Sequence, residues 1–113
     1  MRWFLRSKIH KATVTDVDLS YVGSIGIDGA LMEKVGILSG EKVLVVDNTN
    51  GPRLETYVIE EEENSGKIVI YGAASRLIKK GDEIIIMGFE LADGKVEAKN
   101  VLVDENNKFI KFL

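Results

Sequence analysis

The sequence predicts a mainly β fold, a small closed β-barrel with short helices, on three observations. Short runs of β-branched residues alternate with turn sequences containing glycine, asparagine or aspartate along most of the chain. The 113 residues suffice for one core, so we expect a single domain, 1–113. Ile37–Val45 resembles Ile78–Ile86, each a Gly-acid turn before an apolar run. A repeated unit favours a pseudo-symmetric barrel without free edges, although Gly-Asp turns also recur by coincidence.

The predicted elements follow from local patterns, taken in chain order. Asp28 suits the N-cap of a short helix over residues 30–35, and Gly36 suits the left-handed position after its end. Asp16–Ser20 reads as a polar connector, and the chain turns helical again after Gly72. The expected strands span residues 2–15, 22–27, 42–47, 53–60, 67–71, 83–89, 95–104 and 109–113.

Two of these strands carry polar side chains in alternation with apolar ones. Asn48–Pro52 is a hairpin turn of the Asn-Gly type. In the returning strand, period-two alternation places Arg53 and Tyr57 on one face and Thr56 on the other. In the first strand, the same rule places Lys8 and His10 on one face, followed there by Ala12 and Val14.

Composition narrows the classes of partner. A net charge of −3 argues against a nucleic acid, because phosphate binding favours a basic face. No apolar run approaches the roughly 20 residues that span a bilayer, so no membrane partner is expected. The chain has no cysteine, so a reducing cytoplasm is the expected location. With one histidine a transition-metal site is not expected, but carboxylates such as the run Glu60–Glu63 could hold a hard cation.

The Gly23–Ser24 peptide bond is the candidate reactive centre. A serine hydroxyl directly after a glycine can reach back to the carbonyl carbon of its own peptide bond, and glycine tolerates strained backbone angles. If the fold holds that geometry, the hydroxyl attacks and the amide becomes an ester. Elimination and hydrolysis then leave a ketone on residue 24. An ordinary turn is the alternative, since Gly-Ser pairs are common.

Five segments, in order, resemble the pyruvoyl-dependent aspartate 1-decarboxylase family. They are Lys8–His10, Asp18–Ser24, Asn48–Gly51, Arg53–Tyr57 and Gly72–Ala74. The resemblance implies a double-psi β-barrel and a homotetramer with active sites between subunits. It also implies that L-aspartate is decarboxylated to β-alanine for pantothenate and coenzyme A synthesis.

The resemblance further implies a cofactor made from the chain itself. Cleavage between Gly23 and Ser24 would give a β chain, 1–23, and an α chain, 24–113, that begins with a covalent pyruvoyl group derived from Ser24. Such a ketone accepts the electrons that decarboxylation leaves on the α-carbon. No metal is implied.

Roles for other residues follow from the same resemblance. Arg53 would anchor the spared carboxylate with Lys8 as a second cation, and Tyr57 would protonate the product carbon. Thr56 would steady the oxyanion during self-cleavage. The small residues Gly72, Ala73 and Ala74 would line the substrate, with His10 and Tyr21 as secondary candidates.

The sequence departs from the family at Tyr71, where the family usually has an asparagine before Gly-Ala-Ala; the tail from Asp104 also differs. Other readings stay open. Tyr57 could be a strand tyrosine at a barrel rim and Arg53 a charge at a hairpin end. The whole chain could be a non-catalytic binding or assembly module, or, with poorer support from its ligands, a metal-dependent hydrolase.

Overall fold

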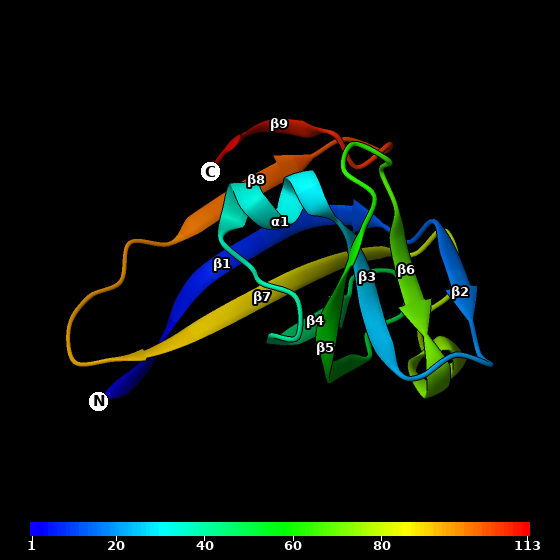
Figure 1. Cartoon of the computed structure of the whole chain (residues 1–113), viewed down its shortest axis with the longest axis horizontal. Helices are drawn as coiled ribbons and strands as arrows, with labels where there is room; N and C mark the ends of the chain where they lie inside the picture. Colours follow the sequence, from blue (N-terminus) through cyan, green and yellow to red (C-terminus); the bar gives the residue numbers. More distant parts are fainter.

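The fold is built from nine strands with one α-helix and one 3-10 helix. Figure 1 shows a computed structural model of the whole chain, residues 1–113. In chain order, the elements are β1 (Arg2–Thr13), β2 (Asp16–Asp18), β3 (Ser24–Asp28), α1 (Gly29–Val35), β4 (Lys42–Asp47), β5 (Arg53–Glu61), β6 (Ile68–Tyr71), the 3-10 helix η1 (Gly72–Arg76), β7 (Glu83–Ala92), β8 (Lys99–Val103) and β9 (Phe109–Phe112). The mainly β prediction is confirmed.

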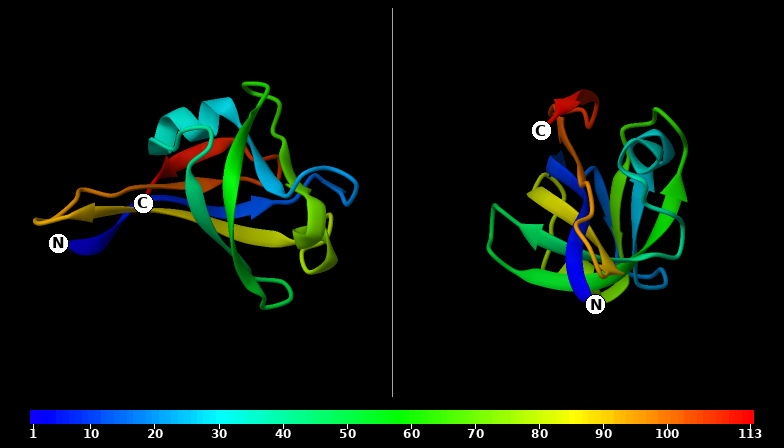
Figure 2. Two further views of the ribbon diagram at one scale, coloured as in Figure 1. Left: turned by 60° about the horizontal axis from the view of Figure 1, so that its bottom comes forward. Right: turned by 90° about the vertical axis from the view of Figure 1, so that its left-hand side faces the viewer.

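All nine strands belong to one strongly curved sheet, with the order β2-β6-β3-β5-β4-β7-β1-β8-β9. β1 and β2 are separated by two residues only, and Thr15 between them donates its backbone N–H to the carbonyl of Ile68 at 2.8 Å. The sheet therefore curls round until the continuation of β1 meets β6, which gives the barrel-like shape in Figure 2. The strand ladders leave β2 and β9 as edges, so full closure of the barrel stays a prediction.

The first copy of the predicted repeat forms a turn that locks onto β5. Gly40, with φ of +88°, donates to the carbonyl of Val58 at 2.7 Å, and Val58 donates back to the carbonyl of Glu41 at 3.0 Å. The Glu41 carboxylate also accepts the backbone N–H of Leu38 at 3.1 Å. The positive φ explains the need for glycine at the turn.

The second copy forms the same turn and locks onto the end of β1. Gly81, with φ of +91°, donates to the carbonyl of Val14 at 2.8 Å, and Val14 donates back to the carbonyl of Asp82 at 2.9 Å. The Asp82 carboxylate accepts the backbone N–H of Lys79 at 3.0 Å. Each hydrogen bond has its counterpart in the first copy, so the internal repeat is confirmed at the level of the two turns.

Helix α1 begins and ends as the sequence predicts. The Asp28 carboxylate accepts the backbone N–H of Ala30 at 2.8 Å, which makes it a true N-cap. Gly36 ends the helix with φ of +75° in the left-handed region. The helix buries Leu31, Met32 and Val35 against a core of isoleucine and valine side chains from β1 and β3–β8, so it covers one side of the curved sheet (Figure 1).

The predicted alternation in β1 is wrong beyond His10. Lys11 adopts φ of +63° within a register shift between Ile9 and Ala12, which is a β-bulge. The extra residue turns Ala12 into the core with Ile9, while Lys8 and His10 lie on the outer, half-buried face. One inserted residue is enough to reverse the side that every later side chain faces.

Three boundaries also differ from the sequence prediction. Asp16–Asp18 is a short strand paired with β6 rather than a connector. β8 begins only at Lys99, not at residue 95. β7 runs on to Ala92, because it pairs with β1 along nearly its whole length, and the two strands extend as a ribbon beyond the barrel (Figure 2).

Candidate active site

The Gly23–Ser24 bond lies at the entrance to a fully buried strand. Ser24 is the first residue of β3, all five residues of which are buried. Its side chain is inaccessible to solvent, and its Oγ donates to the carbonyl oxygen of Val22 at 3.2 Å. β3 runs between β5 and β6, with Ser24 opposite Tyr71. The fold thus holds the hydroxyl in a dry, fixed place next to the bond.

Gly72 packs directly against this bond. Its φ is +75°, and a Cβ placed on it would lie 2.6 Å from the Cα of Gly23 and 3.1 Å from the carbonyl oxygen of Tyr21. The Ser75 hydroxyl donates to the Gly72 carbonyl at 2.7 Å and fixes the start of η1. Both the positive φ and the close approach exclude any other residue here. Ala73 follows as an exposed residue of η1.

Tyr71 contacts side chains of two other segments. Its hydroxyl donates to Oε2 of Glu61 at 2.8 Å, and its ring centroid lies 4.8 Å from that of Tyr21. Burial, and then the Glu61 carboxylate, raise the pKa of Tyr71 to about 12. A phenol held this way donates a proton poorly, so Tyr71 is a weak candidate for the acid. No sequence pattern distinguishes Glu61 from its neighbours in the run Glu60–Glu63.

Tyr57 is the better-placed tyrosine. β3 and β5 run parallel, and Ile25 of β3 is opposite Val58 of β5. Tyr57, one residue before Val58, therefore lies beside the Ser24 end of β3. Its side chain is 39% exposed and makes no hydrogen bond within the chain. The alternation predicted for β5 is confirmed: Arg53 and Tyr57 are exposed, whereas Thr56 is half-buried.

Lys8, His10 and Arg53 do not join the cluster around Ser24. β1 is separated from β5 by β7 and β4, three strand spacings or roughly 14 Å. Arg53 stands four residues before Tyr57 on β5, roughly 13 Å along the strand. One chain therefore presents the cleavage cluster, the Lys8–His10 pair and Arg53 at three separate places on the sheet.

His10 is half-buried, and one of its ring nitrogens is buried without a partner. Burial, and then the neighbouring Lys8 and Lys11 side chains, lower the pKa of His10. Its Nδ1 has no hydrogen-bond partner within the chain. A neutral imidazole beside Lys8 leaves the lysine as the cation of this group.

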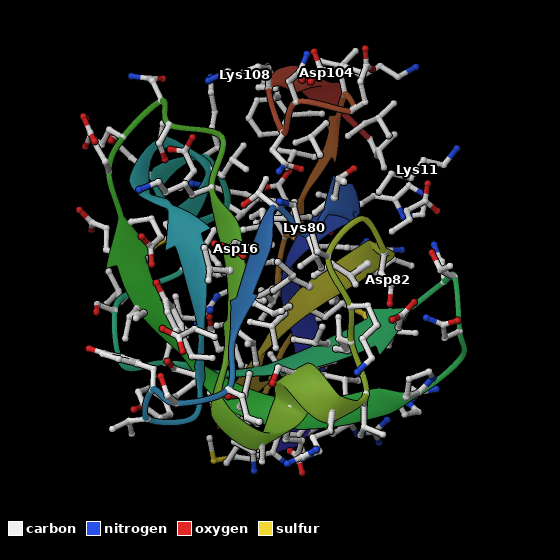
Figure 3. All side chains as sticks on the ribbon, turned by 90° about the vertical axis from the view of Figure 1, so that its right-hand side faces the viewer. Lys11, Asp16, Lys80, Asp82, Asp104 and Lys108 are labelled. Atoms are coloured by element: carbon white, nitrogen blue, oxygen red, sulfur yellow. The ribbon has the colours of Figure 1, made fainter.

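A second titratable pair joins Asp47, at the end of β4, to Asp82 in the turn before β7, which is labelled in Figure 3. Burial, and next the Asp82 carboxyl, raise the pKa of Asp47, whose Oδ2 has no hydrogen-bond partner. Burial alone would raise the pKa of Asp82. The neighbouring Asp47 carboxyl and hydrogen bonds from the Lys79 backbone and the Asn50 amide outweigh burial, so the pKa of Asp82 is lowered. The two neighbouring carboxyl groups therefore have pKa values shifted in opposite directions.

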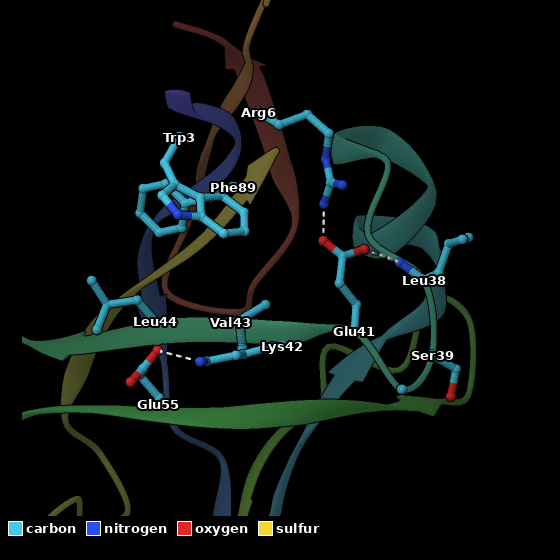
Figure 4. A pocket seen from close by; sticks show the side chains of 11 residues that line it. Trp3, Arg6, Leu38, Ser39, Glu41, Lys42, Val43, Leu44, Glu55 and Phe89 are labelled. Carbon is cyan, nitrogen blue, oxygen red and sulfur yellow. Dashed lines mark hydrogen bonds and ion pairs between the residues drawn. The ribbon is translucent and has the colours of Figure 1, made fainter. Parts of the chain in front are cut away.

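A cavity of about 810 Å³ contains none of the predicted site residues. In Figure 4 the Trp3 and Phe89 rings lie together on one side, while Arg6 pairs with Glu41 on the other. Its lining comes from β1, β4, β5, β7 and the loop before β4: Trp3, Arg6, Leu38, Ser39, Gly40, Glu41, Lys42, Val43, Leu44, Glu55 and Phe89.

Fold and site together define a small, mainly β protein with a glycine–serine bond held by close backbone packing at the start of a buried strand. A family model described as aspartate decarboxylase matches residues 1–110. The chain belongs to this family. No helix of the structure combines the length and the apolar character needed to cross a membrane.

Individual relatives agree with the family match. A protein of Clostridium botulinum (strain Loch Maree / Type A3), named aspartate 1-decarboxylase, is 55% identical over 105 residues, covering 93% of this chain and 76% of its own. One of Caldicellulosiruptor saccharolyticus is 53% identical, covering 95% and 87%. One of Bacillus cereus (strain G9842) is 47% identical, covering 99% and 91%. Both carry the same name.

Proposed function

We propose that this chain is a self-processing decarboxylase that converts L-aspartate to β-alanine and CO2 for pantothenate and coenzyme A synthesis. One observation carries the proposal: the buried Ser24 follows a Gly23 whose backbone is in close contact with Gly72. Membership of the aspartate decarboxylase family supports it, as do relatives named aspartate 1-decarboxylase at 47–55% identity.

Self-cleavage is the first activity we propose. The Ser24 Oγ attacks the Gly23 carbonyl carbon, the C–N bond breaks, and residue 24 is left as a free amine esterified through its oxygen. Loss of the Ser24 α-proton and rupture of the Cβ–Oγ bond release the Gly23 carboxylate. Tautomerisation and addition of one water then release ammonia and leave a ketone. Thr56, on the strand beside β3, is our candidate for steadying the oxyanion of the first step.

The residues around Ser24 fit a pyruvoyl group at that position. The site is closed to solvent, and the glycine at position 72 leaves room for only a small backbone group. Such a ketone would supply the electron sink for loss of the α-carboxylate. Arg53 would hold the spared carboxylate by a bidentate pair, with Lys8 as a second cation. Tyr57, whose hydroxyl is free, would donate the proton to the α-carbon.

We further propose that the active site lies between subunits of a homo-oligomer, with a tetramer as the expected form. The position of Lys8 on β1, three strands from β5, supports this, because a lysine so placed is distant from the cluster around Ser24 within one chain. A neighbouring copy would supply the cations. The cytoplasmic location stays a prediction from composition.

The decisive experiment is an intact mass measured after denaturation, together with a β-alanine assay. We expect two fragments, 1–23 and 24–113, the larger beginning with a ketone, and release of CO2 from L-aspartate. A non-catalytic binding or assembly module would give one unbroken chain and no β-alanine, and that result would refute the proposal.

A further inference from the structure

The Glu61 side chain crosses a neighbouring strand to reach its partner. It starts on β5, passes over Gly26 in the middle of β3 and receives the hydroxyl of Tyr71 on β6 at 2.8 Å. A Cβ placed on Gly26 would lie 2.9 Å from both Cγ and Cδ of Glu61. Because Gly26 has no side chain, there is room above it for the Glu61 side chain to reach Tyr71.

Tyr71 in turn contacts the chain on both sides of the cleavage bond. Its backbone pairs with Ser24, and its ring lies 4.8 Å from the ring of Tyr21, tilted by 50°. The next residue, Gly72, packs against the Gly23 backbone and the Tyr21 carbonyl. The position of the Tyr71 ring is thus coupled to the segment that enters the reactive bond.

The Glu61 carboxylate is held in place by its hydrogen bond to Tyr71 and not by an ion pair. Glu61 makes no salt bridge within the chain, and the phenol is the sole partner of its carboxylate. The two side chains form one wall of a small pocket of about 340 Å³, whose other wall carries Asp16, Asp18 and Lys67. The Glu61 carboxylate shares this pocket with the carboxylates of Asp16 and Asp18, so a hydrogen bond from a neutral hydroxyl group stabilises it.

From these contacts we infer that Glu61 is a positioning residue for self-cleavage: through Tyr71 it holds Tyr21 and the segment that leads to the Gly23–Ser24 bond. This inference rests on the self-processing function proposed above. Attack on a peptide carbonyl requires the reacting atoms to be held close and aligned, so a small loosening of this segment slows the reaction. In this chain the pair takes the place of an asparagine.

The test is the rate of self-cleavage in chains made by pulse-labelled cell-free translation and followed on denaturing gels. Glu61→Ala should slow cleavage on the order of tenfold, the effect of losing one charge-assisted hydrogen bond. Glu61→Gln keeps an acceptor for the phenol and should cleave near the wild-type rate. Tyr71→Phe keeps the ring and should match Glu61→Ala, and the double variant should be no slower than either single one.

Glu62→Ala is the matched control, because it removes the same charge from an exposed neighbour and should leave the rate unchanged. Melting temperatures in an uncleavable Ser24→Ala background separate positioning from loss of the fold. Three results would overturn the role of Glu61: wild-type rates in Glu61→Ala, equal slowing in Glu61→Gln, or effects of the two residues that add. A wild-type chain that never cleaves would instead refute the proposed function itself.

Discussion

Ser24 and Tyr57 carry hydroxyl groups on neighbouring strands, and their expected roles are separable. Ser24→Ala removes the attacking oxygen, so the chain should stay in one piece and form no β-alanine. Tyr57→Phe retains Ser24 and the ring, so it should still cleave at Gly23–Ser24 but turn over aspartate more slowly, because a proton donor is lost. Intact mass and a β-alanine assay measure the two effects independently.

Each half of this prediction can fail alone. Cleavage or turnover by Ser24→Ala would remove the serine from the mechanism. A wild-type rate for Tyr57→Phe would reassign the acid; Tyr21 would then be preferred to Tyr71, whose hydroxyl is bound to Glu61 with a pKa raised to about 12.

Arg53→Ala should affect catalysis and not maturation. Arg53 lies four residues away from the Tyr57 position on β5, outside the cluster around Ser24, so self-cleavage should proceed normally. Loss of a charge-assisted hydrogen bond to the substrate should lower kcat/KM by about 10- to 100-fold. Arg2→Ala, an exposed arginine at the start of β1, is the control. Unchanged kinetics in Arg53→Ala would exclude it from the site.

At the scale of elements, the Asn107 side chain ties the turn between β8 and β9 to the rest of the fold. Asn107 is buried in a left-handed conformation; it accepts from the Thr13 N–H at 2.8 Å and donates to the carbonyls of Thr13 at 2.9 Å and Gly66 at 2.8 Å. Asn107→Ala loses all three bonds, so we expect a loss of about 3 kcal/mol in unfolding free energy. Asn106→Ala, on the exposed side of the turn, should cost far less in the same urea titration.

The turn that carries Asp82 should show a pH-dependent stability. Folding raises the pKa of Asp47, so its stabilising contribution is present below the ordinary aspartate pKa and is lost as pH rises through the folded value. The pH dependence contributed by Asp82 has the opposite sign. Folding lowers the pKa of Asp82, so its stabilising contribution is present at neutral pH and is lost on acidification. At neutral pH the charge on Asp47 therefore opposes folding.

Asp47→Asn should relieve that opposition. The amide oxygen can still accept the backbone N–H groups of Thr49 and Asn50, while the amide nitrogen can donate towards Asp82. We expect a higher urea midpoint than wild type at about pH 7, with the advantage shrinking towards about pH 4, where Asp47 is protonated. Urea unfolding of both chains in a Ser24→Ala background measures this. An advantage that does not change with pH would contradict it.

The elements predicted correctly are those with strong local signals. Caps such as Asp28 and Gly36 fix their own geometry, and the Gly-acid repeat was visible because each copy makes the same local hydrogen bonds. The hairpin between β4 and β5 is confirmed, but its Asn-Gly type is wrong: of its residues only Gly51 has a positive φ, and the Asp47 carboxylate accepts the N–H groups of Thr49 and Asn50. The bulge at Lys11 was missed because its cause is non-local: β1 pairs with β7 and β8 at the same time, and neither strand is adjacent to it in the sequence. Glu61 was missed because its partner stands two strands away.

For the whole molecule, the separation between the cluster around Ser24 and the cations predicts complementation between inactive variants. Ser24→Ala subunits retain Arg53, and Arg53→Ala subunits retain Ser24. In randomly mixed oligomers, roughly a quarter of the sites would combine an intact serine with an intact arginine from a neighbour. We expect that share of activity to appear when the two variants are coexpressed. No recovery, or full activity in a monomer by light scattering, would contradict a site between subunits.

β1 pairs with β7 on one side and β8 on the other, and it contributes Ile9 and Ala12 to the core. A break after Gly23 would therefore separate a central strand from the rest of the covalent chain without freeing it. The matured protein would behave as a complex of two chains, in which the smaller chain supplies a central strand of the sheet. Its unfolding would become a dissociation governed by mass action, so refolding would depend on the concentration of both fragments.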